Sequence, residues 1–140
     1  MEELLAFALL HSVGFDIETD YRNKLDELFL ETPEDDTLLE LESMSSKTKE
    51  SMDYIRLHFD YDQFDRYTFG KFLMETLKKH YSNTEIHLFA RRMYLLWQRL
   101  PDNIQNEKPF DTMSYAGDSL TWGDEKQTRN HLEYMLNEYT

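Results

Sequence analysis

Carboxylates alternate with aromatic side chains in the stretch HFDYDQFDRY, residues 58–67. Such a pattern suits a calcium-binding loop, an acidic catalytic cluster or a surface that binds a basic protein. A calcium loop of the EF-hand kind begun at Asp60 needs an oxygen ligand at its fifth position, glycine at its sixth and glutamate at its twelfth. Those positions hold Phe64, Asp65 and Lys71, so this type of calcium loop is excluded.

Other catalytic chemistry finds little support in the residues. The chain has no cysteine, which excludes thiolate nucleophiles, thiolate metal ligands and disulfides. The sequence has no His-Glu-x-x-His, no Gly-x-Ser-x-Gly, no phosphate loop and no dinucleotide fingerprint. We therefore expect no enzymatic activity, no cofactor and no metal. One enzymatic alternative remains, in which His80 or His87 acts with Glu85, although a predicted helix break separates the two histidines.

The negative charge is concentrated in the first half of the sequence. The chain carries 28 acidic residues against 15 Lys and Arg, a net charge of −13. Residues 1–65 hold 18 of the acids and 5 of the bases, which gives −13, whereas residues 66–140 hold 10 of each, which gives 0. An acidic field repels nucleic acid and speeds encounter with basic proteins. We therefore predict a basic protein partner, with no direct contact to nucleic acid or membrane.

Two clusters of acids are the densest in the sequence, and we predict that they bind the partner. One lies in the helix expected around Glu34 to Glu42, and the other is the strip Asp53, Asp60, Asp62 and Asp65. Tyrosine adds contact area at low entropic cost, and aspartates pair with Lys or Arg. We expect Phe59 and Phe64 to anchor the second cluster inward. The predicted partner-binding residues are Asp35, Asp36, Glu40, Glu42, Asp53, Asp60, Tyr61, Asp62 and Asp65.

Apolar residues recur at helical spacing through most of the chain. We predict an all-α fold, with residues 1–140 forming one irregular bundle of about seven short helices. The expected helices are 3–13, one from about 20, one from about 33, 49–58, 66–81, 82–100 and 124–139. Thr32 is expected to cap the third helix with Pro33 at its first position. Ser82 and Glu85 are expected to form a capping box at the sixth.

The segment 101–123 is long for a loop within a compact domain. It contains too many large apolar residues for a free tail: Ile104, Phe110, Met113, Tyr115, Leu120 and Trp122. We expect it to pack against the helices, with a short helix around 111–116. An ordered crossover is one interpretation, and a binding surface that includes Tyr115 or Trp122 is the other.

The N-terminal segment MEELLAFALLHSVGF contains an apolar run of about ten residues, which is too short to span a bilayer. A signal peptide begins with basic residues, whereas this segment begins with Glu2 and Glu3. We therefore expect a buried helix here, in a cytoplasmic protein.

A small, cysteine-free, acidic helical protein with acids and tyrosine gathered at 34–42 and in HFDYDQFDRY resembles the immunity proteins of bacterial contact-dependent growth inhibition systems. The resemblance implies that the partner is the toxic domain of a delivered effector, commonly a basic nuclease. It also implies inhibition by occlusion, with carboxylates in the place of phosphates in the toxin's cleft. Two other hypotheses remain: a nucleic-acid mimic that inhibits a DNA- or RNA-binding protein, and a non-enzymatic helical adaptor.

Overall fold

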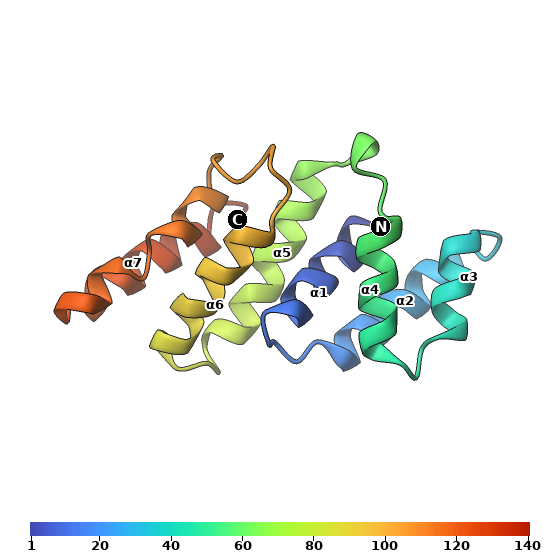
Figure 1. Cartoon of the computed structure of the whole chain (residues 1–140), viewed down its shortest axis with the longest axis horizontal. Coiled ribbons are helices and arrows are strands. Elements are labelled where there is room, and N and C mark those ends of the chain that lie inside the picture. The colour runs from blue at the N-terminus through green and yellow to red at the C-terminus, as the bar shows by residue number, and fades with distance from the viewer. The chain divides into compact units, whose positions relative to one another are not determined.

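All regular secondary structure in the protein is helical, which confirms the all-α prediction. The computed structural model describes residues 1–140 and contains seven α-helices and three short 3-10 helices (Figure 1). In chain order they are α1 (Glu2–Ser12), α2 (Glu18–Glu31), α3 (Asp36–Ser43), α4 (Thr48–His58), η1 (Tyr61–Gln63), α5 (Arg66–Tyr81), α6 (Ile86–Arg99), η2 (Phe110–Ser114), η3 (Asp118–Trp122) and α7 (Glu125–Leu136). None of these helices combines the length and the apolar character needed to cross a membrane.

The helices fall into two compact units that meet in the sequence between residues 65 and 66. Met1–Asp65, the acidic unit, contains α1 to α4 and η1, whereas Arg66–Thr140, the neutral unit, contains the remaining helices. This boundary coincides with the change in charge, because the acidic unit carries the whole net charge of −13. The expectation that residues 1–140 form one domain remains a prediction.

The acidic unit is built around α1. All seven residues from Leu4 to Leu10 are buried, as expected for a helix that is apolar nearly all round. Within the unit, α1 packs against α4 and α2, and α2 packs against α3. Gly14 follows α1 with a positive φ of 101°, a conformation that favours glycine and turns the chain towards α2.

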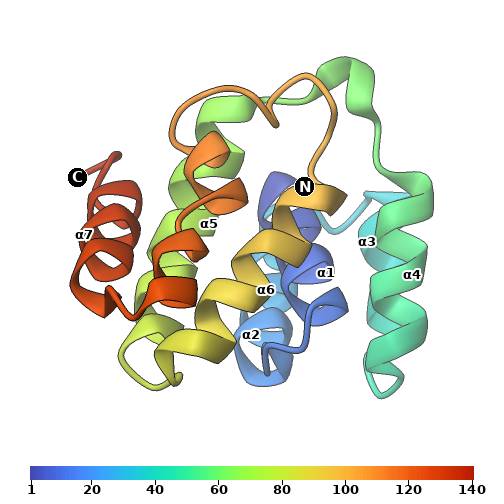
Figure 2. The same cartoon turned by 60° about the vertical axis from the view of Figure 1, so that its left-hand side comes forward.

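The neutral unit places the two later 3-10 helices against its α-helices. η2 contacts both α6 and α7, and η3 contacts α7 (Figure 2). The long segment 101–123 is therefore packed, as expected, and η2 is the short helix predicted around 111–116. Trp97 helps to hold it: its indole N–H donates to the Gln105 carbonyl oxygen at 2.8 Å, and the Gln105 amide donates back to the Trp97 carbonyl oxygen at 2.9 Å. Tyr115 and Trp122 remain exposed.

Two predicted helix starts are wrong, and both errors concern the cap. α3 begins at Asp36, and its cap is Asp35, whose carboxylate accepts the Leu38 N–H at 3.1 Å. α6 begins at Ile86, with Glu85 alone as its cap. In both cases a carboxylate one position before the helix accepts orphan N–H groups directly. Thr32 and Ser82, the expected caps, lie outside the helices.

The C-terminal helix is shorter than predicted. α7 ends at Leu136, and Tyr139 beyond it is partly buried rather than part of the helical core. Its phenol lies so close to Gly70 of α5 that a Cβ atom at position 70 would overlap the ring and stand 2.9 Å from Phe110 Cζ. A glycine at this point of α5 therefore permits the approach of both aromatic rings.

Candidate partner-binding surface

The segment after α4 is held in place by its own aromatic residues. Phe59 is buried and packs edge-on against Tyr61 and Phe64, with ring centroids 4.9 and 5.9 Å apart. Phe64 is only partly buried, and 47% of Tyr61 is exposed. The expectation that phenylalanine anchors this segment is thus met fully by Phe59 and partly by Phe64.

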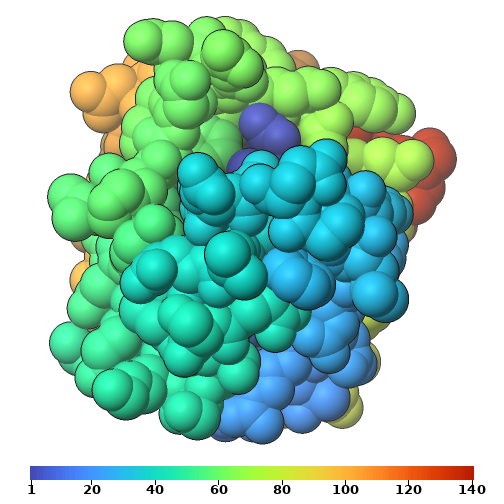
Figure 3. Space-filling model, turned by 90° about the vertical axis from the view of Figure 1, so that its right-hand side faces the viewer, coloured from blue at the N-terminus to red at the C-terminus, as the bar shows by residue number.

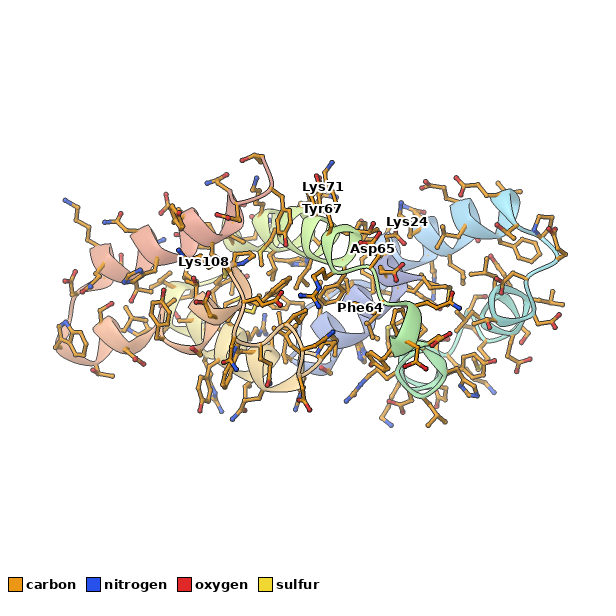
Figure 4. All side chains as sticks on the ribbon, turned by 90° about the horizontal axis from the view of Figure 1, so that it is seen from above. Lys24, Phe64, Asp65, Tyr67, Lys71 and Lys108 are labelled. Carbon is orange, nitrogen blue, oxygen red and sulfur yellow. The ribbon has the colours of Figure 1, made fainter.

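The aspartates of this segment are exposed, and two of them are fixed by backbone hydrogen bonds. The Asp60 carboxylate accepts the Asp62 N–H at 3.0 Å and so caps η1. The backbone N–H of Asp65 donates to Glu2 Oε2 at 3.1 Å, which ties the end of the segment to the start of α1. Figure 4 shows Phe64 and Asp65 on the short segment that follows η1. These bonds fix the backbone from which Asp60, Asp62 and Asp65 present their charges.

One acid at the start of α3 caps the helix, whereas two acids within α3 are exposed and form no ion pair. Asp35 is half-buried because it caps the helix. Asp36 and Glu40 are exposed and form no ion pair within the acidic unit. Leu39, more than half exposed, lies between them in sequence. The helix therefore offers carboxylates together with an apolar side chain, a combination suited to a protein interface.

A hollow lies between the first turn of α3 and the segment after α4, the two elements that carry the predicted acid clusters. It has a volume of about 310 Å³ and is lined by Met1, Glu2, Thr37, His58, Phe59, Asp60 and Gln63. Thr37 lies in the first turn of α3, directly after Asp36, and Asp60 belongs to the second cluster. Figure 3 shows the first residues of the chain, in dark blue, exposed between the cyan start of α3 and the green segment after α4. Of the predicted residues, Asp60 lines the hollow, and Asp35 and Asp36 adjoin it in sequence.

A second feature of the acidic unit is a pair of carboxyl groups from neighbouring helices. The pKa of Glu42 is raised because partial burial penalises its charge and because the Asp26 carboxyl lies within hydrogen-bonding reach. Asp26 belongs to α2, which packs on α3. Like charges held this close disfavour the ionised form, so this contact between helices has an electrostatic cost at neutral pH.

Tyr21, in α2, is fully buried. Burial is the main cause that raises the pKa of its phenol to about 12, and the charge of Glu42 adds to it. The Ser51 hydroxyl is nearby, but it donates to the Met44 or Lys47 carbonyl oxygen, at 3.0 and 2.9 Å. The buried Tyr21 hydroxyl has no hydrogen bond of good geometry, although the nearby Ser51 side chain acts against the rise in its pKa.

Asp53 belongs neither to the hollow beside Asp60 nor to the pair formed by Glu42 and Asp26. It lies on the exposed face of α4 and pairs with Lys49, one turn earlier, at 3.3 Å. The structure does not bring Asp53 or Glu42 to the hollow. Sequence reasoning also missed Asp26, Glu2 and Thr37, whose positions depend on helix packing that no local pattern encodes.

The residues of the enzymatic alternative, His80 or His87 with Glu85, lie in the neutral unit. Glu85 Oε1 contacts His87 Nδ1 at 2.7 Å, and the Glu85 carboxylate accepts the backbone N–H groups of His87 and Leu88. These hydrogen bonds lower the pKa of Glu85 to about 2, and the bond from the His87 backbone N–H has the largest effect. Helix capping accounts for this contact, because the carboxylate already satisfies the N-terminus of α6. No group of three or more His, Asp and Glu residues is placed to hold a metal ion.

Comparisons of the chain with protein-family models, with curated proteins and with solved structures found no match.

Proposed function

We propose that this chain is an immunity protein that binds a basic toxin domain through its acidic unit. The observation that carries the proposal is the location of the charge: one compact unit, Met1–Asp65, holds the entire net charge of −13. A field of this kind attracts a basic protein over several ångströms and accelerates encounter. The toxin's identity as a nuclease is part of the proposal and follows from the resemblance to immunity proteins.

Inhibition would occur by occlusion of the toxin's active site. The hollow beside Asp60 has room for one basic side chain, and Asp36, Glu40 and Asp62 are further exposed carboxylates of the acidic unit. In a nuclease these charges would occupy positions that substrate phosphates otherwise fill. Tyr61 and Leu39, both about half exposed, would provide the apolar contact that charge alone does not give.

The pair formed by Glu42 and Asp26 supports the same proposal. The proximity of Asp26 disfavours the charged form of Glu42, whose pKa is raised, so ionisation of Glu42 destabilises the free protein at neutral pH. A lysine or arginine from a partner would relieve that repulsion on binding. Unfavourable like-charge contacts of this kind are typical of functional surfaces, at which stability is sacrificed for binding.

The test compares two variants with equal changes in charge. Asp36→Asn/Glu40→Gln/Asp62→Asn neutralises three exposed acids of the acidic unit that have no capping role. Glu75→Gln/Asp102→Asn/Asp118→Asn neutralises three exposed acids of the neutral unit. Each variant has a net charge of −13 + 3 = −10. The probe is the basic toxin domain encoded by a neighbouring gene, with affinity measured by calorimetry between 50 and 300 mM salt, about the range over which screening changes most.

We expect the first variant to weaken binding by about tenfold or more and to flatten the salt dependence, because it removes charges at the interface. The second variant should change the affinity by less than about threefold. Equal losses in both variants, or none in either, would reject the surface. If the neighbouring genes encode no toxin and the chain binds a DNA- or RNA-binding protein instead, the nucleic-acid-mimic hypothesis replaces the immunity proposal.

A further inference from the structure

The neutral unit contains a pocket that the proposed function does not use. It has a volume of about 370 Å³, and its polar lining includes Lys108, Asp111, Tyr115, His131, Tyr134 and Glu138. These residues come from the segment that leads into η2, from η2 and its C-cap, and from α7 and the residues that follow it. Figure 4 marks Lys108 on the segment before η2. The pocket therefore combines two carboxylates with exposed phenol rings.

The Asp111 carboxylate is the most informative group in the pocket. Its Oδ1 atom is buried and accepts no hydrogen bond, and the carboxylate forms no ion pair within the neutral unit. Its backbone is fixed, since its N–H donates to the Glu107 carbonyl oxygen at 3.0 Å and its own carbonyl oxygen accepts from Ser114 Oγ at 2.7 Å. A buried carboxylate oxygen without a donor is uncommon. The charge of the Asp111 carboxylate is therefore not neutralised within the unit, and a cation in the pocket that Asp111 lines would balance it.

The aromatic residues make the pocket suitable for a cation. Tyr115 packs at 82° to the His131 ring, with centroids 5.4 Å apart, and 43% of Tyr115 stays exposed. Tyr134 is 68% exposed. Phenol faces attract ammonium and guanidinium groups, and the attraction increases when a carboxylate lies on the other side of the cation. The pocket contains two carboxylates, Asp111 and Glu138, and one lysine, Lys108, so a cationic ligand balances its charge better than a neutral or anionic one does.

We propose that this pocket binds an organic cation, an ammonium or guanidinium group that contacts the Asp111 carboxylate and the Tyr115 and Tyr134 rings. The site is independent of the acidic unit and of its proposed partner. Lys108 is the internal competitor, because it lines the same pocket and forms no ion pair within the unit. Its removal should therefore tighten binding of an external cation.

The first experiment uses matched probes on the full chain. N-acetyl-lysine methylamide and N-acetyl-arginine methylamide carry the cation, and N-acetyl-norleucine methylamide has a similar shape without charge. Binding is followed by two-dimensional NMR with uniform ¹⁵N labelling. We expect shifts at Asp111, Tyr115 and Tyr134 for at least one of the cationic probes and none for norleucine. Equal binding of the neutral probe, failure of both cations to bind, or shifts located elsewhere would overturn the proposal.

Three variants and a control sharpen the result. Asp111→Asn keeps the size of the side chain and should weaken cation binding by about tenfold, and Tyr134→Ala should weaken it by about threefold. Lys108→Met should strengthen binding. Asp102→Asn, an equal change in charge at an exposed residue outside the pocket, should leave it unchanged. An Asp111→Asn protein that is folded by circular dichroism and binds as the wild type does would overturn the proposal.

A free amine can supply the same chemistry as a protein side chain. Butylammonium and putrescine test binding of free amines, and a lysine- or arginine-containing pentapeptide tests binding of a protein side chain. Tighter binding of the free amines assigns the pocket to a small metabolite class, whereas tighter binding of the peptide assigns it to a protein chain. If neither group binds more tightly than norleucine amide does, the cation site is rejected.

Discussion

The acidic and neutral units have similar interiors and very different surfaces. Each buries leucine, phenylalanine and methionine from short helices, and each caps helices with carboxylates such as Asp35 and Asp124. Yet one unit carries a net charge of −13 and the other carries none. Since the neutral unit builds the same kind of core with balanced charge, helical packing does not require the acidity. The excess charge opposes compactness, so helical packing does not explain its presence in one unit.

The largest expected effect tests whether the two interiors are equivalent. Leu10→Ala in α1 and Leu77→Ala in α5 each remove a fully buried side chain. We expect each change to lower the free energy of unfolding by about 2 to 5 kcal/mol, from lost burial and the cavity left behind. Urea denaturation followed by circular dichroism measures both. A loss below about 1 kcal/mol in only one of them would show that the two cores differ in packing.

The next effect concerns a close approach in the neutral unit. Gly70→Ala gains about 1 kcal/mol of helix propensity, but the added methyl group overlaps Tyr139 and meets Phe110 Cζ at 2.9 Å. Overpacking costs about 1 to 3 kcal/mol, so we expect a net loss. Gly117→Ala is the control, because its methyl group would meet only Ala90 Cβ, at 3.0 Å. Thermal denaturation measures both variants. A lower melting temperature for Gly117→Ala than for Gly70→Ala would contradict this account.

A smaller effect compares one capping interaction in two electrostatic settings. Asp35 accepts the Leu38 N–H at 3.1 Å, and Asp124 accepts the Gln127 N–H at 3.0 Å. Replacing either with alanine removes about 1 kcal/mol of capping. In the acidic unit the change also relieves repulsion, so Asp35→Ala should cost less than Asp124→Ala at low salt. The difference between the two losses in the free energy of unfolding should shrink in 1 M salt. Urea titrations at low salt and in 1 M salt measure it, and a difference that does not shrink would contradict the prediction.

The smallest expected effect is a gain in stability. Because the folded pKa of Glu42 is raised above its unfolded value, the ionised form destabilises the folded state at neutral pH. Glu42→Gln should therefore stabilise the protein at pH 7 by less than about 1 kcal/mol, since the site is partly exposed. The gain should vanish as the pH falls below the unfolded pKa, where Glu42 is protonated in both states. Glu40→Gln, at an exposed position, serves as the control in melting curves at pH 3.5 and 7.

Local patterns predicted the helices well where the apolar spacing was long and regular. The predicted helix 66–81 coincides with α5, and 49–58 differs from α4 by one residue. The start of α3 was missed because Thr32 and Pro33 form an acceptable local cap, and only the structure shows that Asp35 is the residue that receives the Leu38 N–H. The 3-10 helix η3 was missed because five residues are too few to show a period.

The candidate surface was predictable only in part. The exposure of Asp60, Asp62 and Asp65 agrees with their alternation with Phe59, which is buried, and Phe64, which is partly buried. The approach of Asp26 to Glu42 depends on how α2 packs on α3, and the hollow depends on where α1 begins relative to residues 37 and 60. Contacts between residues so distant in sequence leave no spacing signal that a single sequence can reveal.

The hydrogen bonds that join Trp97 and Gln105 have a spectroscopic consequence. Both tryptophans of the chain, Trp97 and Trp122, belong to the neutral unit. Trp97 is partly buried and bonded through its indole, whereas Trp122 is mostly exposed. Emission excited at about 295 nm will therefore follow the neutral unit alone, whereas far-ultraviolet circular dichroism follows the helices of both units. Superimposable melting curves from the two signals would mean that the two units unfold together, and separated curves would mean that each unfolds by itself.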